Sequence, residues 1–214
     1  ASGMSAAEQL AELEAAKTRL AYTGVDSYVM LVSVLVQLAD ARAKPTIVTS
    51  ALEAVARVMA FEVSSRASQG HEARFDQRPY FRLLLNFQRE LLATSAALAG
   101  SSSTAASLNG VVGVGDGPAS SSSTSAEELE EKLLAAFAEA YHLYFSPEHA
   151  PGFAFSWLEL ISHHSILPKF VRDEKGWFVL HELVLDLLRF MEPYLRTVQM
   201  TPAVNVLYKG TLRF

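Results

Sequence analysis

The 214-residue sequence contains no cysteine. Disulfide frameworks and thiolate zinc sites are therefore excluded, and the composition fits a reducing compartment. Basic residues are also scarce, because 18 Lys and Arg stand against 23 Asp and Glu to give a net charge of −5. Since phosphate binding requires clustered basic side chains, we expect neither a general nucleic-acid surface nor an anionic-membrane surface.

Targeting and membrane-spanning signals are also missing from the sequence pattern. The N-terminal ASGMSAAEQL lacks the basic region and the apolar core of a signal peptide. The apolar run Tyr28–Leu38 has about eleven residues, fewer than the roughly 20 needed to cross a bilayer, so it is predicted to be a buried helix. The expected location is the cytoplasm, with the nucleus as a second compartment.

The sequence contains partial matches to metal-binding and phosphate-binding motifs, and each of them is incomplete. Glu159 and His163 have the i, i+4 spacing of two metal ligands, but no motif places a third, and the adjacent His163 and His164 point about 100° apart on a helix. The glycines of 113–117 lack the strand and helix of a phosphate loop. No Ser lies in a nucleophile elbow, and four further histidines have no assigned partner: His71, His142, His149 and His181. We therefore predict no catalytic, metal or cofactor-binding residues, no cofactor and no enzymatic activity.

Helical periodicity is what the sequence does contain. Half of the residues are apolar, they recur at i, i+3, i+4 and i+7, and no segment alternates as a strand would. The pattern predicts an all-α fold of antiparallel helix pairs, an α-solenoid of about 7–8 helices, with a compact orthogonal bundle as the alternative. The expected helices cover 6–22, a segment from Asp26 to Pro45, 46–64, 79–100, a segment from Ser125 to Pro147, 151–170, a segment from Lys175 to about Pro193, and one from Thr201.

The compact apolar segment Pro151–Phe170 is predicted to be the central helix. Its apolar side chains recur at helical spacing, at Phe153, Trp157, Leu160, Ile161 and Leu167. Trp157 and Trp177 stand in apolar surroundings, so core packing is favoured for both over a role as interface anchors. The acidic run Glu127–Glu131 is interpreted as a solvated first turn of its helix.

A low-complexity stretch divides the chain. Residues 101–125 are mostly Ser, Gly, Ala and Thr with almost no charge, and such a composition cannot bury enough surface to offset its ordering entropy. The predicted organisation is helical pairs in 1–100, a flexible insertion in 101–125, and a continuation of the same helical domain in 126–214.

Several separate motifs occur in a fixed order: FDQRPYFRLLLNFQREL at Phe75–Leu91, PGFAFSWLELISHHSILPKF, KGW at Lys175–Trp177, PYLR at Pro193–Arg196 and LYKGTLR at Leu207–Arg213. The sequence thereby resembles the C-terminal homology domain of the Not-one scaffold family of the Ccr–Not messenger-RNA deadenylase complex. The resemblance covers about 75–98 and 137–214 and implies HEAT-like helices. That family domain continues past LYKGTLR, which implies that this chain is its N-terminal part, either a fragment or a truncated paralogue.

The resemblance implies a non-catalytic scaffold that docks the Not-two and Not-three or Not-five subunits and supports mRNA deadenylation, mRNA decay and translational repression. Regulatory RNA-binding proteins are further expected partners. The final helix is expected to leave an apolar face uncovered, and the candidate partner-binding residues are Trp157, His163, Val204, Leu207, Tyr208 and Lys209. The alternative is an unrelated all-α adaptor or a helical enzyme that shares only the solenoid layout.

Overall fold

The structure is a computed structural model that describes residues 6–68, 75–105, 121–172, 174–198 and 200–213. Within these ranges it contains helices and no strand, which confirms the predicted all-α class. The α-helices are α1 (Ala6–Leu38), α2 (Lys44–Ser68), α3 (Arg78–Ala105), α4 (Ser121–Ala140), α5 (Ala154–Ile161), α6 (Leu167–Phe170), α7 (Glu174–Arg196) and α8 (Pro202–Thr211). A π-helical turn (Tyr141–Phe145) extends α4, and a 3₁₀ turn (Pro151–Phe153) precedes α5.

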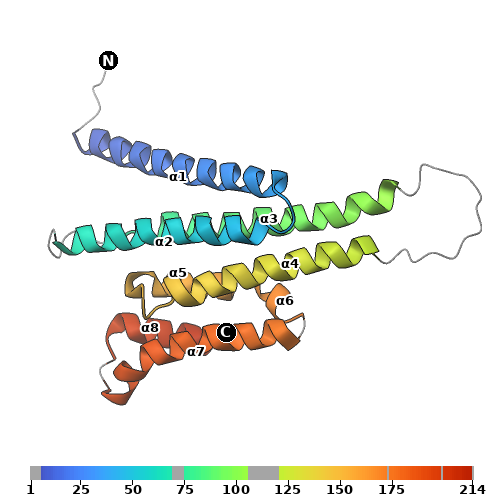
Figure 1. The fold of residues 1–214 in the computed structure, drawn as a ribbon. Coiled ribbons are helices and arrows are strands. Elements are labelled where there is room, and N and C mark those ends of the chain that lie inside the picture. Colours follow the sequence, from blue (N-terminus) through green and yellow to red (C-terminus); the bar gives the residue numbers. More distant parts are fainter. Residues whose placement is uncertain (1–5, 69–74, 106–120, 173, 199, 214) are drawn as a thin grey trace, which may run out of the picture.

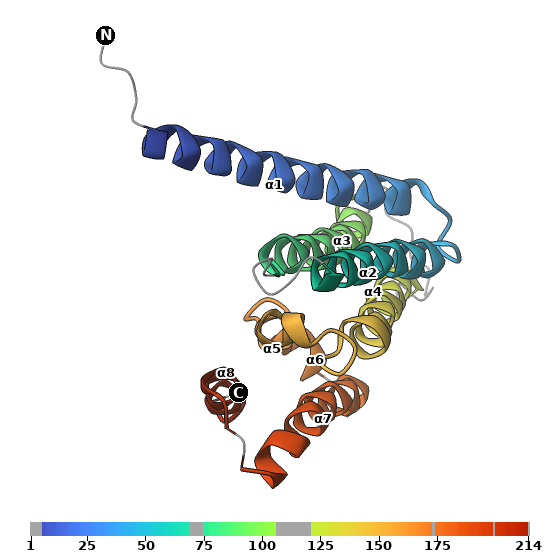
Figure 2. The same ribbon diagram turned by 90° about the vertical axis from the view of Figure 1, so that its left-hand side faces the viewer.

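The helices are stacked in successive layers (Figures 1 and 2). Helix α1 lies on one end of the stack, α2 and α3 form the next layer, α4 with α5 and α6 the third, and α7 with α8 the last. Helix α3 packs against both α1 and α4, and α2 packs against α4. Because each layer buries its apolar face mainly against its neighbours, the arrangement agrees with the predicted solenoid-like fold.

Aromatic side chains fill the centre of the stack. Phe87 of α3 meets Phe137 of α4 edge-on with ring centroids 5.4 Å apart, and the row of rings continues through Tyr141 and Phe145 to Phe153. All five side chains are fully buried. Edge-to-face contacts of this kind add to the free energy gained by burial. The predicted inward faces of α3, α4 and the α5 segment are therefore the core.

Helix α1 corrects the predicted break at Gly24. The helix runs unbroken through Gly24 to Leu38. A glycine in a helix interior costs only about 1 kcal/mol, and the Thr23 hydroxyl donates to the Arg19 carbonyl one turn earlier. Asp26, expected to cap a second helix, instead binds Arg82 of α3 at 2.7 Å. Asp26 therefore forms a contact between two helices instead of capping one.

The predicted single helix 151–170 is divided into α5 and α6. Helix α5 ends at Ile161, and a turn separates it from α6. At the end of α5 the Ser162 hydroxyl donates to the Leu158 carbonyl. In the turn, the His163 Nδ1 accepts from the Ser165 backbone N–H. Such local side-chain bonds give the backbone an alternative to the helical ladder.

Other helix ends also differ from prediction. Helix α3 continues to Ala105 and α4 begins at Ser121, so the first and last five residues of the expected insertion are helical, and 106–120 lie outside the described residues. Ser125 lies inside α4 and is not its first residue. Pro193 lies within α7, which ends at Arg196. The predicted start of the last helix is confirmed, because the Val204 N–H donates to the Thr201 hydroxyl, 3.3 Å away.

Burial of individual side chains differs from prediction at the surface of the stack. The helical spacing of the sequence predicts inward positions for Leu35 and Leu38 of α1, Val58 of α2 and Leu188 of α7, but these side chains are exposed, as is Trp177. The same spacing predicts an apolar face from Leu10, Leu13 and Leu20 of α1, which is also exposed. The side chain of Leu98 lies outside the described side chains.

Candidate partner-binding surfaces

The structure does not bring the predicted partner-binding residues together on one open face. Trp157 is fully buried, and its indole N–H donates to the Tyr141 carbonyl, 3.4 Å away in the π-helical turn. Val204 and Leu207 are also buried. These three side chains therefore contact the rest of the chain and offer no surface to a partner.

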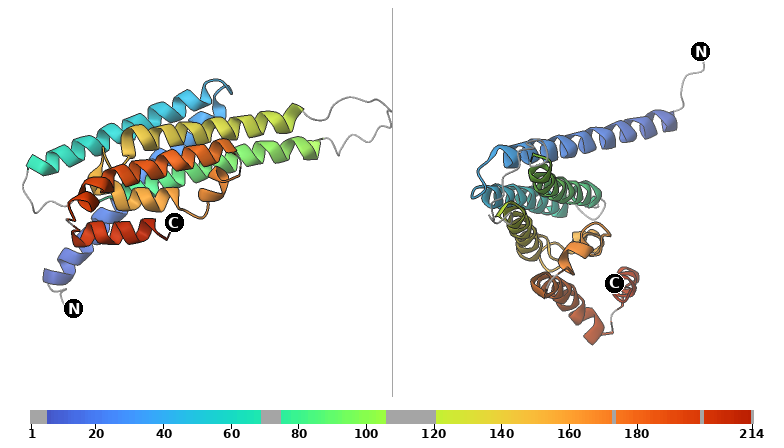
Figure 3. Two further views of the ribbon diagram at one scale, coloured as in Figure 1. Left: turned by 90° about the horizontal axis from the view of Figure 1, so that it is seen from below. Right: turned by 90° about the vertical axis from the view of Figure 1, so that its right-hand side faces the viewer.

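Helix α8 turns its expected open face inward. It packs against α5 and α7, and this contact buries Val204 and Leu207 while Tyr208 is half-buried. Lys209 is exposed on the other side (Figure 3 shows α8 at the edge of the stack). The sequence could not reveal this packing, because the amphipathic pattern of α8 does not say which helix covers it.

His163 lies in the turn after α5, half-buried beside His164, with the two ring centroids 4.3 Å apart. Burial lowers the pKa of His163 below its ordinary value of 6.5, and the charges of His164 and Arg89 lower it further, while Glu159 acts in the opposite direction. The neutral imidazole is the favoured form.

Other histidines, without an assigned partner in the sequence, have one in the structure. His142 Nδ1 lies 2.6 Å from the carboxylate of Asp186, a buried residue of α7 that also binds Arg189. His149 Nδ1 lies 2.8 Å from the Ser146 hydroxyl, but Ser146 is buried and out of reach of a substrate. His71 lies outside the described residues. Among the residues that the structure describes, no group of three or more potential metal ligands occurs.

The acidic run Glu127–Glu131 is not the first turn of its helix, although Glu127, Glu128 and Glu131 are exposed as expected. Helix α4 begins six residues earlier, at Ser121, and Glu130 is buried. The Glu130 carboxylate binds Lys169 at 2.6 Å and lies 3.8 Å from Arg172. The basic cluster at 169–175 is the sequence signal for this contact, but sequence spacing alone does not identify its partner.

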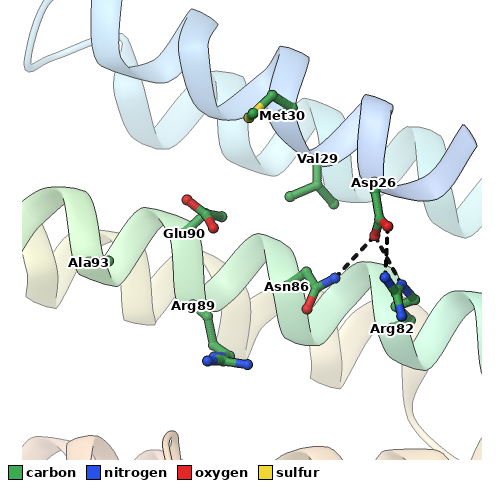
Figure 4. A pocket seen from close by; sticks show the side chains of 8 residues that line it. All are labelled: Asp26, Val29, Met30, Arg82, Asn86, Arg89, Glu90 and Ala93. Carbon is green, nitrogen blue, oxygen red and sulfur yellow. Dashed lines mark hydrogen bonds and ion pairs between the residues drawn. The ribbon is translucent and has the colours of Figure 1, made fainter. Parts of the chain in front are cut away.

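A groove of about 440 Å³ is lined by residues of α1 and α3 (Figure 4). Its polar end holds Asp26, which accepts hydrogen bonds from Arg82 at 2.7 Å and Asn86 at 3.2 Å. The hydrogen bond with Arg82 keeps the pKa of Asp26 below its ordinary value of 3.8. At this end of the groove, hydrogen bonds join the α1 layer to the α3 layer. Val29 and Met30 form an apolar part of the groove wall.

The outer side of α1 carries an exposed apolar stripe, defined by Met30, Leu31, Val34, Leu35 and Leu38. The whole segment Glu12–Leu38 is long and apolar enough to cross a membrane by length and composition alone, with 24% of its most apolar window buried. One such helix in the described residues is weak evidence for a span, and the Asp26–Arg82 ion pair attaches it to α3. The prediction that Tyr28–Leu38 is a buried helix is correct for its inner face only.

Two adjacent aromatic residues mark the first turns of α7. Trp177 is 58% exposed and Phe178 is 66% exposed, although the sequence favoured core packing for Trp177. The inner face of α7 is formed instead by Leu180, Leu183, Leu187 and Met191, which are all buried. Exposed tryptophan is enriched at the energetic centres of protein interfaces. We call Trp177 and Phe178 the α7 aromatic pair, and it is the most distinctive candidate surface.

Comparison with known proteins shows similarity to Not1 subunits of the CCR4-NOT complex. Residues 118–214 match the family model described as "CCR4-Not complex component, Not1". The chain is 34% identical over 143 residues to the General negative regulator of transcription subunit 1 of Saccharomyces cerevisiae, covering 65% of this chain and 6% of the yeast protein. It is 29% identical over 96 residues to the CCR4-NOT transcription complex subunit let-711 of Caenorhabditis elegans, covering 41% of this chain and 4% of that protein. The motif resemblance noted in the sequence is thereby confirmed.

Proposed function

Because residues 118–214 match the Not1 family model and the chain is similar to Not1 subunits, we propose that this chain is a non-catalytic scaffold module of the CCR4-Not complex. In this role it docks the Not-two and Not-three or Not-five subunits, and through them supports mRNA deadenylation, mRNA decay and translational repression. Regulatory RNA-binding proteins are further partners in this proposal, and the cytoplasm and nucleus are the proposed locations.

The observation that carries the proposal is that the matched segment presents the α7 aromatic pair to solvent. The family match covers all of α4 to α8, and within it Trp177 and Phe178 are large, exposed and adjacent. A monomeric surface gains nothing from exposing two such side chains, whereas an interface gains binding energy by burying them. We assign subunit docking to this face of α7.

A non-catalytic role also agrees with the titratable groups of the described residues. Two serine–histidine contacts occur within turns: His163 Nδ1 lies 2.7 Å from the hydroxyl of Ser165, two residues on, and His149 Nδ1 lies 2.8 Å from that of the buried Ser146. Asp186 is held by His142 and Arg189 as part of the contact between the π-helical turn and α7. These contacts lie within turns or join the π-helical turn to α7, and we take this as support for the scaffold over the helical-enzyme alternative.

The test is a pull-down of a purified Not-two/Not-three pair by the immobilised chain. We expect the wild-type chain to retain the pair and the double variant Trp177→Ala/Phe178→Ala to retain much less. Phe61→Ala is the matched control, because Phe61 is an exposed aromatic residue of α2 outside the family match. If circular dichroism shows that the wild type and the control are folded and neither retains the Not-two/Not-three pair, the result would favour an unrelated adaptor.

A further inference from the structure

A second feature of the matched segment is a small hollow where α4, α6 and the start of α7 meet. It has a volume of about 220 Å³. The apolar part of its wall comes from Leu134 and Phe170, both buried, together with Val179. The small residues Ala135 and Gly176 complete the wall and leave the space open.

A close backbone contact between α6 and α7 fixes one side of the hollow. At Gly176 an added Cβ would lie 2.1 Å from the Phe170 carbonyl oxygen, so only glycine lets the end of α6 approach the first turns of α7 so closely. The Lys169–Glu130 ion pair, 2.6 Å long, joins α6 to α4 on the other side. The three walls are therefore fixed relative to one another before any ligand binds.

Basic side chains surround the mouth of the hollow. Lys169, Arg172 and Lys175 all line it, and among its described lining residues Glu131 supplies the carboxylate. Glu131 binds Lys175 at 2.7 Å, but both side chains are largely exposed, and exposed ion pairs of this kind are worth about 0–1 kcal/mol. Arg172 has a loose contact of 3.8 Å to Glu130 and is half-exposed. Lys175 and Arg172 can therefore exchange these contacts for the carboxylates of a ligand.

We propose that this hollow binds a short peptide segment of a partner protein that carries one large apolar side chain, aromatic or leucine, flanked by acidic residues. The volume fits this anchor, because apolar cavities of about 150 Å³ already accept benzene. The surrounding cations fit the acidic flanks, and the guanidinium of Arg172 presents a fork that matches a carboxylate. This site goes beyond the proposed docking of the Not-two/Not-three pair on the α7 aromatic pair, and it can be tested without that pair.

The experiment is a selection of random eight-residue peptides displayed on phage against the folded chain. Enriched peptides are synthesised with a fluorescent label, and their affinity is measured by anisotropy. We expect the enriched sequences to share one Phe, Tyr, Trp or Leu next to at least two Asp or Glu. Raising the salt concentration should weaken their binding, because the flanking contacts are screened.

Two variants of the hollow and two matched controls locate the binding. Ala135→Trp fills the space from an exposed position, and Arg172→Gln/Lys175→Gln removes two cations; each should weaken binding at least about tenfold. Ala203→Trp and Arg196→Gln/Lys17→Gln make the same changes at exposed positions elsewhere and should leave the affinity unchanged. Thermal melts of all four variants verify folding.

Three results would overturn the proposal. The first is a selection that enriches no peptide, or only peptides without an apolar anchor and acidic flanks. The second is equal affinity of the enriched peptides for Ala135→Trp and Ala203→Trp. The third is binding of a labelled poly-uridine RNA that is weakened by Arg172→Gln/Lys175→Gln and unaffected by Ala135→Trp. In that case the basic side chains at the mouth of the hollow contact nucleic acid instead of an acidic peptide.

Discussion

Helices α1 and α5 are both strongly apolar, yet they occupy opposite environments. Helix α5 has 8 residues and buries Trp157, Leu160 and Ile161 completely. Helix α1 has 33 residues, and its outer stripe, including Leu31 and Leu38, is exposed. The difference lies in neighbours: α5 packs against α3, α7 and α8, whereas α1 packs against α2 and α3 on one side only. Position in the stack, rather than hydrophobicity, decides burial.

The largest expected effect separates the two tryptophans. Trp157→Ala should lower the free energy of unfolding by about 3–5 kcal/mol, because it empties a fully enclosed site in the core. Trp177→Ala should change it by no more than about 0.5 kcal/mol, because that side chain is exposed. Urea unfolding followed by circular dichroism measures both. Similar values for the two variants would contradict the burial difference.

Two helical glycines, Gly24 of α1 and Gly176 of α7, give the next comparison. Gly176→Ala should destabilise the chain by about 3 kcal/mol, because the new methyl group would meet the backbone of Phe170 and the helices must move apart. Gly24→Ala, which meets nothing within 4 Å in α1, should stabilise by about 0.5–1 kcal/mol. Thermal melts of both variants test the signs. A stabilising Gly176→Ala would show that α6 and α7 are not in close contact.

Neighbouring residues of α1 offer a third comparison. Val32→Ala should cost about 2 kcal/mol, because Val32 is buried against the next layer. Leu31→Ala, one residue earlier on the outer stripe, should leave the free energy of unfolding within about 0.5 kcal/mol of wild type. Chemical denaturation distinguishes the two. An equal loss at both positions would mean that another part of the chain covers the outer stripe.

The smallest expected effect belongs to the link between α1 and α3. Asp26→Asn should cost about 0.2–1 kcal/mol near neutral pH, because it removes a partly exposed ion pair with Arg82. The pKa of Asp26 is lowered in the folded chain, so its stabilising contribution is present above the ordinary value of 3.8 and is lost as the pH falls through the lower folded pKa. Stability curves of wild type and variant, recorded from pH 7 downwards, should therefore converge in acid.

The fold class and most of the inner faces could be predicted from the sequence. Residues such as Phe87, Phe137, Leu160 and Leu187 recur at helical spacing, and each lies in the core. Periodicity reports which side of a helix is apolar, and in the middle of a stack both neighbours are present to cover that side. The prediction therefore succeeded where helices are surrounded.

The errors arise where tertiary contacts override local signals. Asp26 has the residue type of a helix cap, but its partner Arg82 lies 56 positions away in the chain. Trp177 has apolar neighbours in sequence, yet Leu180 is buried whereas Trp177 and Phe178 are exposed. For α8 the pattern was recognised, but the covering helix α5 is more than 40 positions earlier. Sequence spacing cannot identify such partners.

The assignment of partner-binding residues succeeded least. Trp157, Val204 and Leu207 were candidates because large apolar residues mark interfaces as well as cores. The structure separates the two cases by exposure, which leaves the α7 aromatic pair as the alternative. Lys209 is exposed and His163 and Tyr208 are half-buried, and their contact with a partner stays a prediction.

Hydrogen–deuterium exchange with and without the Not-two/Not-three pair tests the central claim most directly. In the free chain, the amides of α5 should exchange slowest, because this helix is enclosed by its neighbours. Addition of the pair should slow exchange in the first turns of α7 and leave α5 unchanged. A scaffold account is contradicted if the pair protects no part of α4 to α8, or if α5 exchanges as fast as the outer turns of α1 in the free chain.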